Sequence, residues 1–192
     1  MCQNPPMSAR CPNGSGIRFR SVDDAFRVLQ VAMGWTDSHL HQFRVGDVVY
    51  GEPDRELEPG PVDDRRVTLN QIAPRATSAC IYEYDFGDGW EHLIEVEDEV
   101  PAAETGGVIP RCLDGERACP PEDCGGAPGY QEILLALADA THPEHDEWRE
   151  WTGPTFDPAA FDLEGVNQAL RRFSPRATPR APKGRARGGR SR

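Results

Sequence analysis

The sequence predicts an α+β fold, a single domain in which two antiparallel β-hairpins form a sheet packed against helices. Three observations predict it. Apolar residues recur at helical spacing near both ends of the chain, they alternate with polar residues in two segments that each contain a tight turn, and the helical and alternating segments are separate along the chain. A length of 192 residues suits one domain with a hydrophobic core.

The first predicted helix lies in "SVDDAFRVLQVAMG" and covers about residues 22–33. Ser21 and Asp24 resemble a capping box at its start, and Gly34 can end it. The next segment, "HLHQFRVGDVVYG", alternates, and Gly46-Asp47 between its apolar runs indicates a hairpin turn. The alternation predicts one shared strand face for four side chains: His39, His41, Phe43 and Val45.

Residues 52–66 are polar and rich in Pro and Asp, which predicts an exposed loop. The second hairpin follows in "ACIYEYDFGDGWEHLIEVE", where aromatic and β-branched residues lie on both sides of Gly87-Asp88-Gly89. On its returning strand, His92 is predicted to share the apolar face with Trp90. We expect the aromatic residues here to fill a core more than to line a cleft: Trp35, Tyr82, Tyr84, Phe86 and Trp90.

Three further helices are predicted around Tyr130–Leu137, Pro143–Trp148 and Leu163–Phe173, the last with Asp162 as a cap. Residues 174–192 contain seven basic and no acidic residues and few apolar ones, so we expect a disordered basic tail. The main domain is therefore predicted to cover residues 21–173.

The net charge of −11 hides an asymmetry, because removal of the basic tail leaves −18 for the first 173 residues. Such a body would repel a phosphate backbone, so any affinity for nucleic acid is expected in the tail at residues 174–192. No apolar run approaches the roughly 18 residues that cross a bilayer, and the N-terminal decapeptide lacks the regions of a signal peptide. We expect a cytoplasmic protein without a membrane partner, whose thiols stay reduced.

The segment "RCLDGERACPPEDCGG", residues 111–126, concentrates cysteines where little regular structure is expected. Three thiolates and one imidazole from the hairpins would form a closed tetrahedral Zn²⁺ site and order this loop. The candidate ligands are Cys112, Cys119, Cys124, His39, His41 and His92. The gaps of six and then four residues between the cysteines differ from the usual spacing of zinc ligands, so a second interpretation stays open: buried thiols and hydrogen-bonded core histidines.

An enzymatic alternative uses the same histidines with carboxylates, since an open metal site activates water for hydrolysis. The candidate carboxylates are Asp85, Asp88, Asp114, Glu122 and Asp123. Asp88 is also favoured by its turn position between two glycines. The sequence contains no nucleophile elbow and no phosphate-binding glycine loop, so we assign no catalytic residue and expect a non-enzymatic protein.

Four strings in order carry a resemblance to a known family: "LQVAMGWTDSHLHQFRVG", "YEYDFGDGWEHLIEVE", "PRCLDGERACPPEDCGGAPGYQEILLALADATHPEH" and "FDPAAFDLEGVNQALR". From about Ser21 to Arg172 the chain closely resembles the plasmid pRiA4b ORF-3-like family. The resemblance implies an α+β fold and a bacterial or archaeal protein found on plasmids, on chromosomes and in insertion elements.

The resemblance implies the fold more firmly than an activity. Some members carry a transposon-resolvase label, but this chain has no matching catalytic signature. Residues 1–20 depart from the family pattern, because "GIRFR" stands where members have a strand with an "IWRR"-like segment. We therefore expect an accessory or binding protein of mobile or plasmid genes, with an unidentified protein partner. A hydrolase or nuclease-like enzyme and a tail-dependent nucleic-acid-binding protein remain alternatives.

Overall fold

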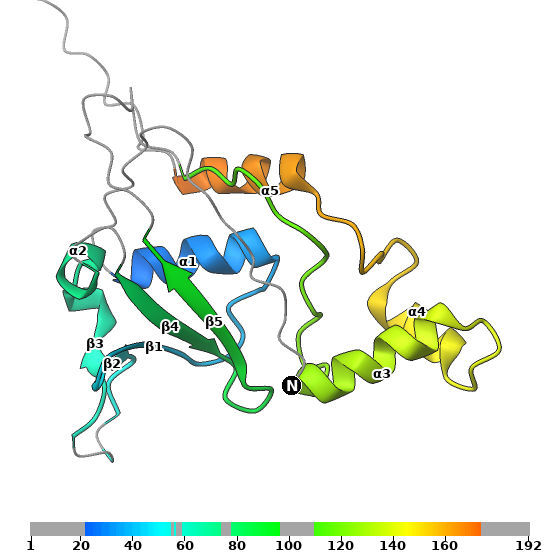
Figure 1. Cartoon of the computed structure of the whole chain (residues 1–192), viewed down its shortest axis with the longest axis horizontal. Helices are drawn as coiled ribbons and strands as arrows, with labels where there is room; N and C mark the ends of the chain where they lie inside the picture. Colours follow the sequence, from blue (N-terminus) through cyan, green and yellow to red (C-terminus); the bar gives the residue numbers. More distant parts are fainter. Residues whose placement is uncertain (1–21, 55, 57–58, 74–77, 97–109, 174–192) are drawn as a thin grey trace, which may run out of the picture.

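The computed structural model describes residues 22–54, 56, 59–73, 78–96 and 110–173. It confirms the α+β class: one five-stranded sheet has helix α1 against one face, and α5 packs beside α1 (Figure 1). Helices α3 and α4 contact each other at one end of the sheet (Figure 1). The elements are α1 Val22–Met33, β1 His41–Val45, β2 Val48–Gly51, β3 Val62–Asp63, the 3₁₀ turn η1 Asp64–Arg66, α2 Leu69–Ile72, β4 Ala79–Tyr84, β5 Trp90–Glu95, α3 Gly126–Ala138, α4 His145–Thr152, α5 Leu163–Leu170 and the 3₁₀ turn η2 Arg171–Phe173.

Both predicted hairpins are present. The strand order is β3-β2-β1-β4-β5, and every neighbouring pair is antiparallel except β2 and β3. Gly46 has a φ of 57° in the turn between β1 and β2, and Gly89 has a φ of 68° in the turn before β5. These left-handed conformations are the ones that glycine adopts without steric cost, which explains why the turns form there.

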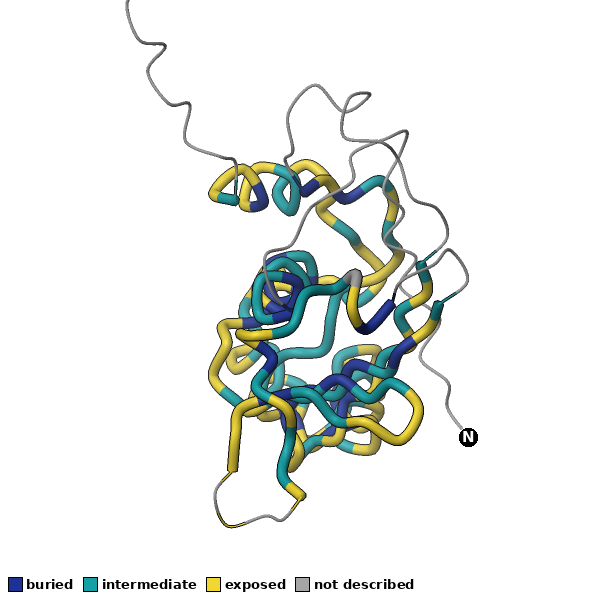
Figure 2. Tube along the Cα trace, turned by 90° about the vertical axis from the view of Figure 1, so that its left-hand side faces the viewer, coloured by how far each residue is buried: buried dark blue, intermediate teal, exposed yellow. Residues whose placement is uncertain are grey.

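The core lies between α1 and the inner face of the sheet, where buried residues gather (Figure 2). Phe43 on β1 pairs with Tyr82 on β4, and both side chains are completely buried. The ring of Phe26 on α1 lies 6.2 Å from that of Tyr82. The buried Tyr82 hydroxyl accepts a hydrogen bond from Gln30 at 2.9 Å, so this polar group is satisfied within the core. Truncation of an aromatic ring at such a site costs about 3–5 kcal/mol.

The aromatic residues bear out the expectation of a core with one exception. Trp35, Tyr82, Tyr84 and Trp90 are buried, whereas Phe86 in the β4–β5 turn is exposed. The alternation on β5 is also as expected, since Trp90 and His92 face inward while Glu91 and Glu95 are exposed.

The prediction of an exposed loop over residues 52–66 is wrong for its last part. Val62–Asp63 forms β3, which pairs in parallel with β2, and Asp64 in η1 is buried. The physical reason is a contact between residues far apart in the sequence. The side chain of Asp64 contacts the imidazole of His41, and this contact holds residues 62–64 against the sheet. His39 precedes β1 and lies in the loop after α1, so it does not belong to the strand face predicted for it.

The predicted helices after residue 126 are confirmed as α3, α4 and α5, and the Asp162 side chain caps α5 by accepting from the Gly165 amide at 2.9 Å. Gly34 ends α1 with a φ of 83°. The capping residue Ser21, the N-terminal segment and the basic tail lie outside the described residues. Within the described residues, no helix has both the length and the apolar character to cross a membrane.

Candidate metal centre

The cysteine-rich segment is held against the domain by side chains from other elements. Trp35 Nε1 donates to the carbonyl of Pro120 at 2.9 Å. The Asn167 side chain on α5 accepts from the Cys112 amide at 2.9 Å and donates to the Cys112 carbonyl at 2.8 Å. These contacts satisfy backbone groups that no regular element pairs, which explains how the loop is ordered without secondary structure of its own.

The three predicted thiol ligands are divided between two apolar clusters. Cys124 is buried in the main core and Cys119 packs against it, whereas Cys112 lies with Val31 and Leu170 in a second cluster under α5. Burial raises the pKa of Cys124 to about 11 and also raises that of Cys119. Since the thiolate is the metal ligand and the nucleophile, this environment favours the protonated, structural form.

Two of the three predicted histidine ligands have other surroundings. The ring of His41 stacks on Phe26, and its Nε2 lies 2.9 Å from Oδ2 of Asp64. The ring of His92 lies between Trp35 and Tyr82, at centroid distances of 5.5 and 5.7 Å. Burial lowers the pKa of His92 because desolvation penalises the imidazolium.

His39 is the predicted ligand that the structure brings together with other donors. One donor atom from each of His39, Asp85 and Asp123 lies within 4.8 Å of the other two. Among the described residues, this is the group of three or more His, Cys, Asp or Glu side chains whose donor atoms lie this close together. It includes none of the thiols. From the sequence, Asp85 and Asp123 are candidates only in the enzymatic alternative; Asp88 and Asp114, the other two aspartates of that alternative, are outside the group.

Three carboxylates surround Nε2 of His39. The distances are 3.2 Å to Oδ1 of Asp123, 3.3 Å to Oε2 of Glu122 and 3.7 Å to Oδ2 of Asp85. The side chain of Asp85 is 10% exposed and that of Asp123 is 74% exposed, so the cluster runs from the edge of the core to solvent. Nε2 of His39 is itself buried, and although the three carboxylate oxygens lie within ion-pair distance, none of the described residues makes a hydrogen bond of acceptable geometry with it.

Asp85 and Asp123 both have left-handed backbone conformations, which set the direction of their side chains. Asp85 has a φ of 53° and Asp123 a φ of 57°, which Asp tolerates better than most residues. Oδ1 of Asp85 accepts from the amides of Gly87 at 3.0 Å and Asp88 at 3.3 Å. Its other oxygen is therefore the one that faces His39. The Asp85 amide donates to the carbonyl of Leu40 at 2.9 Å, which joins the β4–β5 turn to the loop that carries His39.

Glu122 is fixed by donors on two other segments. It accepts from the Thr36 amide at 2.6 Å and from the Tyr84 hydroxyl, which lies 3.0 Å from Oε2. Burial raises the pKa of Tyr84 to about 12, so the hydroxyl remains a donor. The carboxylate is thus held beside the imidazole instead of swinging into solvent.

One imidazole nitrogen with several carboxylate oxygens is a donor set for divalent cations such as Mn²⁺ and Zn²⁺. The enzymatic alternative contains these residues within a larger set of histidines and carboxylates. The sequence could not separate them from the other candidates, because they come from the loop after α1, the β4–β5 turn and the loop before α3, and no spacing links them. The structural feature that distinguishes Asp85 and Asp123 is their left-handed backbone, and the sequence contains no signal for it.

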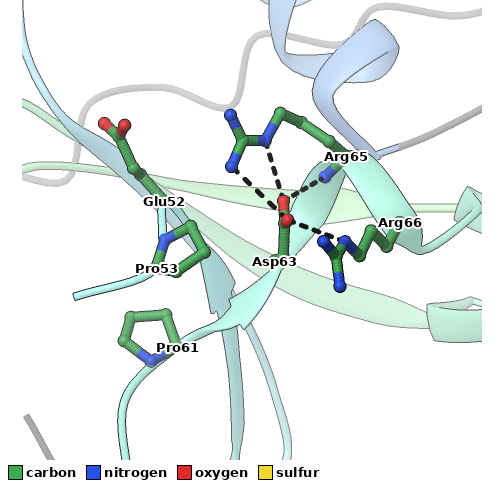
Figure 3. A pocket seen from close by; sticks show the side chains of 6 residues that line it. All are labelled: Glu52, Pro53, Pro61, Asp63, Arg65 and Arg66. Carbon is green, nitrogen blue, oxygen red and sulfur yellow. Dashed lines mark hydrogen bonds and ion pairs between the residues drawn. The ribbon is translucent and has the colours of Figure 1, made fainter. Parts of the chain in front are cut away.

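A cavity of about 510 Å³ lies elsewhere, between Glu52, Pro53, Pro61, Asp63, Arg65 and Arg66 (Figure 3). Asp63 accepts from Arg65 Nε at 2.9 Å, and its other oxygen lies 3.1 Å from Arg66 Nε. Asp63 therefore pairs with both arginines of this cavity, and we assign no ligand to the cavity.

Comparison with known proteins gives the chain's relatives. The chain is 48% identical over 145 residues to an uncharacterised protein of Sinorhizobium fredii, covering 74% of each chain. The crystal structure of a protein of unknown function from Methanosarcina mazei Go1 resembles it with a TM-score of 0.67 at 32% identity, over 75% of this chain and 82% of that one. The sequence model of the plasmid pRiA4b ORF-3-like proteins matches residues 18–165. The chain therefore belongs to the plasmid pRiA4b ORF-3-like protein family.

Proposed function

We propose that the protein is a divalent-cation-binding domain, with His39, Asp85 and Asp123 as ligands and Glu122 beside them. The observation that carries the proposal is the buried Nε2 of His39, which has no hydrogen-bond partner among the described residues and faces three carboxylates. A buried polar atom without a partner costs free energy, and like charges so close together repel. A cation between them would relieve both costs.

The cation would join three segments that are far apart in the sequence. The loop after α1, the β4–β5 turn and the loop before α3 each contribute to the cluster. A ligand that binds only the folded chain stabilises it, by about 2.7 kcal/mol when its concentration is a hundred times its Kd. The proposal keeps the metal expected from the sequence and takes its ligand chemistry, an imidazole with carboxylates, from the enzymatic alternative instead of the thiol site. Zinc is one candidate cation and Mn²⁺ is another.

The role proposed for the cation is structural, in support of an accessory or binding protein. Hydrolysis is a second candidate, favoured by one observation: Asp123 is largely exposed, which would leave coordination positions open to water. The third function considered from the sequence, nucleic-acid binding by residues 174–192, concerns a segment outside the described residues. It rests on the tail's composition alone.

Thermal unfolding of the full chain, purified without a histidine tag and stripped with chelator, tests the proposal. We expect Mn²⁺ or Zn²⁺ to raise the Tm of the wild type by several degrees, and His39→Gln or Asp85→Asn to abolish most of that rise. Asn at position 85 can still accept from Gly87, so the turn is preserved. Glu116→Gln, an exposed change in the loop that carries Asp123, is the control and should keep the full rise. A wild-type Tm that no divalent cation raises would reject the proposal.

A further inference from the structure

Helix α4 carries an exposed tryptophan with two carboxylates near it on the helix surface. Glu147 lies three residues before Glu150 and four residues before Trp151, so its side chain neighbours both on one face of the helix. Trp151 is 46% exposed, and its ring meets that of Trp148 edge to face at 5.4 Å. No residue of α4 is buried. We call Glu147, Glu150 and Trp151 the tryptophan face.

The carboxylates of this face are not paired with a basic residue in the described part of the chain. Among the described residues, neither Glu147 nor Glu150 forms an ion pair, and Arg149 on the same helix donates instead to the carbonyl of Phe156 at 3.1 Å. A guanidinium group can lie flat on an indole ring and pair with a carboxylate beside it at the same time. The tryptophan face thus fits arginine better than it fits an apolar or an anionic partner.

The chain itself supplies arginine in quantity. Residues 174–192 contain six arginines and one lysine without any acidic residue, and the remaining 173 residues carry a net charge of −18. This segment starts directly after η2, which ends at Phe173. Nineteen residues can span up to about 60 Å when extended, which is enough to reach any part of a domain of this size.

We infer that the tryptophan face of α4 is a docking surface for the arginine-rich C-terminal segment of the same chain, residues 174–192. Charge complementarity attracts the segment to the acidic body, and stacking on Trp151 selects arginine and this site. The contact withholds the same arginines from phosphate groups, so a nucleic acid has to displace the tryptophan face before it binds the segment. The inference is independent of the metal centre.

A peptide-binding experiment tests this contact on the full-length chain. The seven basic residues of the segment are replaced by Gln, and a fluorescent peptide of residues 174–192 is added to that chain while its anisotropy is measured. We expect binding that weakens steeply with salt. Trp151→Ala should weaken it by about two- to fivefold, the loss of one exposed cation–π contact. The double variant Glu147→Gln, Glu150→Gln should weaken it and flatten its salt dependence.

The matched control removes two exposed carboxylates at the other end of the sheet, by Asp47→Asn together with Glu52→Gln. We expect this pair to change the affinity much less than the α4 pair. The unaltered chain should bind the peptide more weakly than the Gln-substituted one, because its own segment occupies the site. The inference would be overturned if the peptide did not bind at low salt or if the two double variants lost affinity equally. It would also be overturned if Trp151→Ala left the affinity unchanged or if the unaltered and the Gln-substituted chains bound the peptide equally.

Discussion

Nε2 of His41 lies 2.9 Å from Oδ2 of Asp64 in the interior, although the rest of β1, all of β2 and β3 and their connecting segments separate the two residues along the chain. Asp64 is 3% exposed, and the His41 ring stacks on Phe26. The pair joins η1 to β1 and so fixes the segment that adds β3 to the sheet edge.

Removal of one partner from this buried pair should destabilise the fold strongly. We expect Asp64→Ala to lower the free energy of unfolding by about 3–5 kcal/mol, because the other polar group is left buried and unpaired. Urea denaturation measures the change. The neighbouring Asp63→Ala is the control: Asp63 pairs with exposed arginines and caps η1 through the Arg65 amide, so its loss should be smaller than that of the buried Asp64. Comparable losses in the two variants would mean that the His41–Asp64 contact does not hold η1 in place.

His92 should make the fold sensitive to acid. Its pKa in the folded chain is lowered from 6.5 by burial, so below about pH 6.5 the unfolded chain binds a proton that the folded chain does not. Stability is therefore complete above that pH and is lost as the pH falls toward the lowered pKa. His92→Phe keeps a flat ring between Trp35 and Tyr82 and should reduce the slope of Tm against pH between about 7 and 5. An identical slope in this variant would show that other groups cause the acid sensitivity.

The thiols of the described residues should be unreactive in the folded chain. Burial raises the pKa of Cys80 to about 11 and raises that of Cys119 as well. In a chain with Cys2→Ser and Cys11→Ser, we expect slow reaction with Ellman's reagent near pH 8 and fast reaction of all four remaining thiols after denaturation. A fast-reacting thiol in the folded chain would identify a reactive cysteine in place of a structural one.

The close approach between α3 and the cysteine-rich loop depends on Gly129. A Cβ at this position would meet the carbonyl oxygen of Cys124. We expect Gly129→Ala to destabilise the chain by roughly 1–3 kcal/mol through this overpacking, although alanine is the better helix former. Glu132→Ala, an exposed change on the same helix, should stay within about 0.5 kcal/mol of the wild type. Equal unfolding curves for Gly129→Ala and the wild type would contradict the packing described.

Local pattern was sufficient to predict most of the fold. The helical spacing of Val22, Phe26 and Leu29 predicted α1, and the glycines at 46 and 89 marked turns whose conformation only a few residues adopt. The pairing of β3 with β2 had no such signal, because the parallel pair involves two residues and depends on the distant contact of Asp64 with His41.

The candidate site was predictable only in its parts. The enzymatic alternative contains His39, Asp85, Glu122 and Asp123, but it contains them among three histidines and five carboxylates that the sequence does not rank. Their convergence depends on the hydrogen bond between Asp85 and Leu40 and on the clamp of Tyr84 on Glu122, which are tertiary contacts. The sequence predicts a zinc site at the cysteines because thiols are common zinc ligands. The structure divides these cysteines between two apolar clusters.

Equilibrium dialysis of the chelator-treated full chain against Mn²⁺, with the bound metal determined by mass spectrometry, tests the cation site most directly. We expect one Mn²⁺ per chain, a loss of at least tenfold in affinity in His39→Gln and Asp85→Asn, and no change in Glu116→Gln. Asp123→Asn should be at least as stable as the wild type without metal, since it removes a repelling charge, and less stable with it. Binding that is absent, or that persists unchanged without His39, would contradict a cation held by this imidazole and its carboxylates.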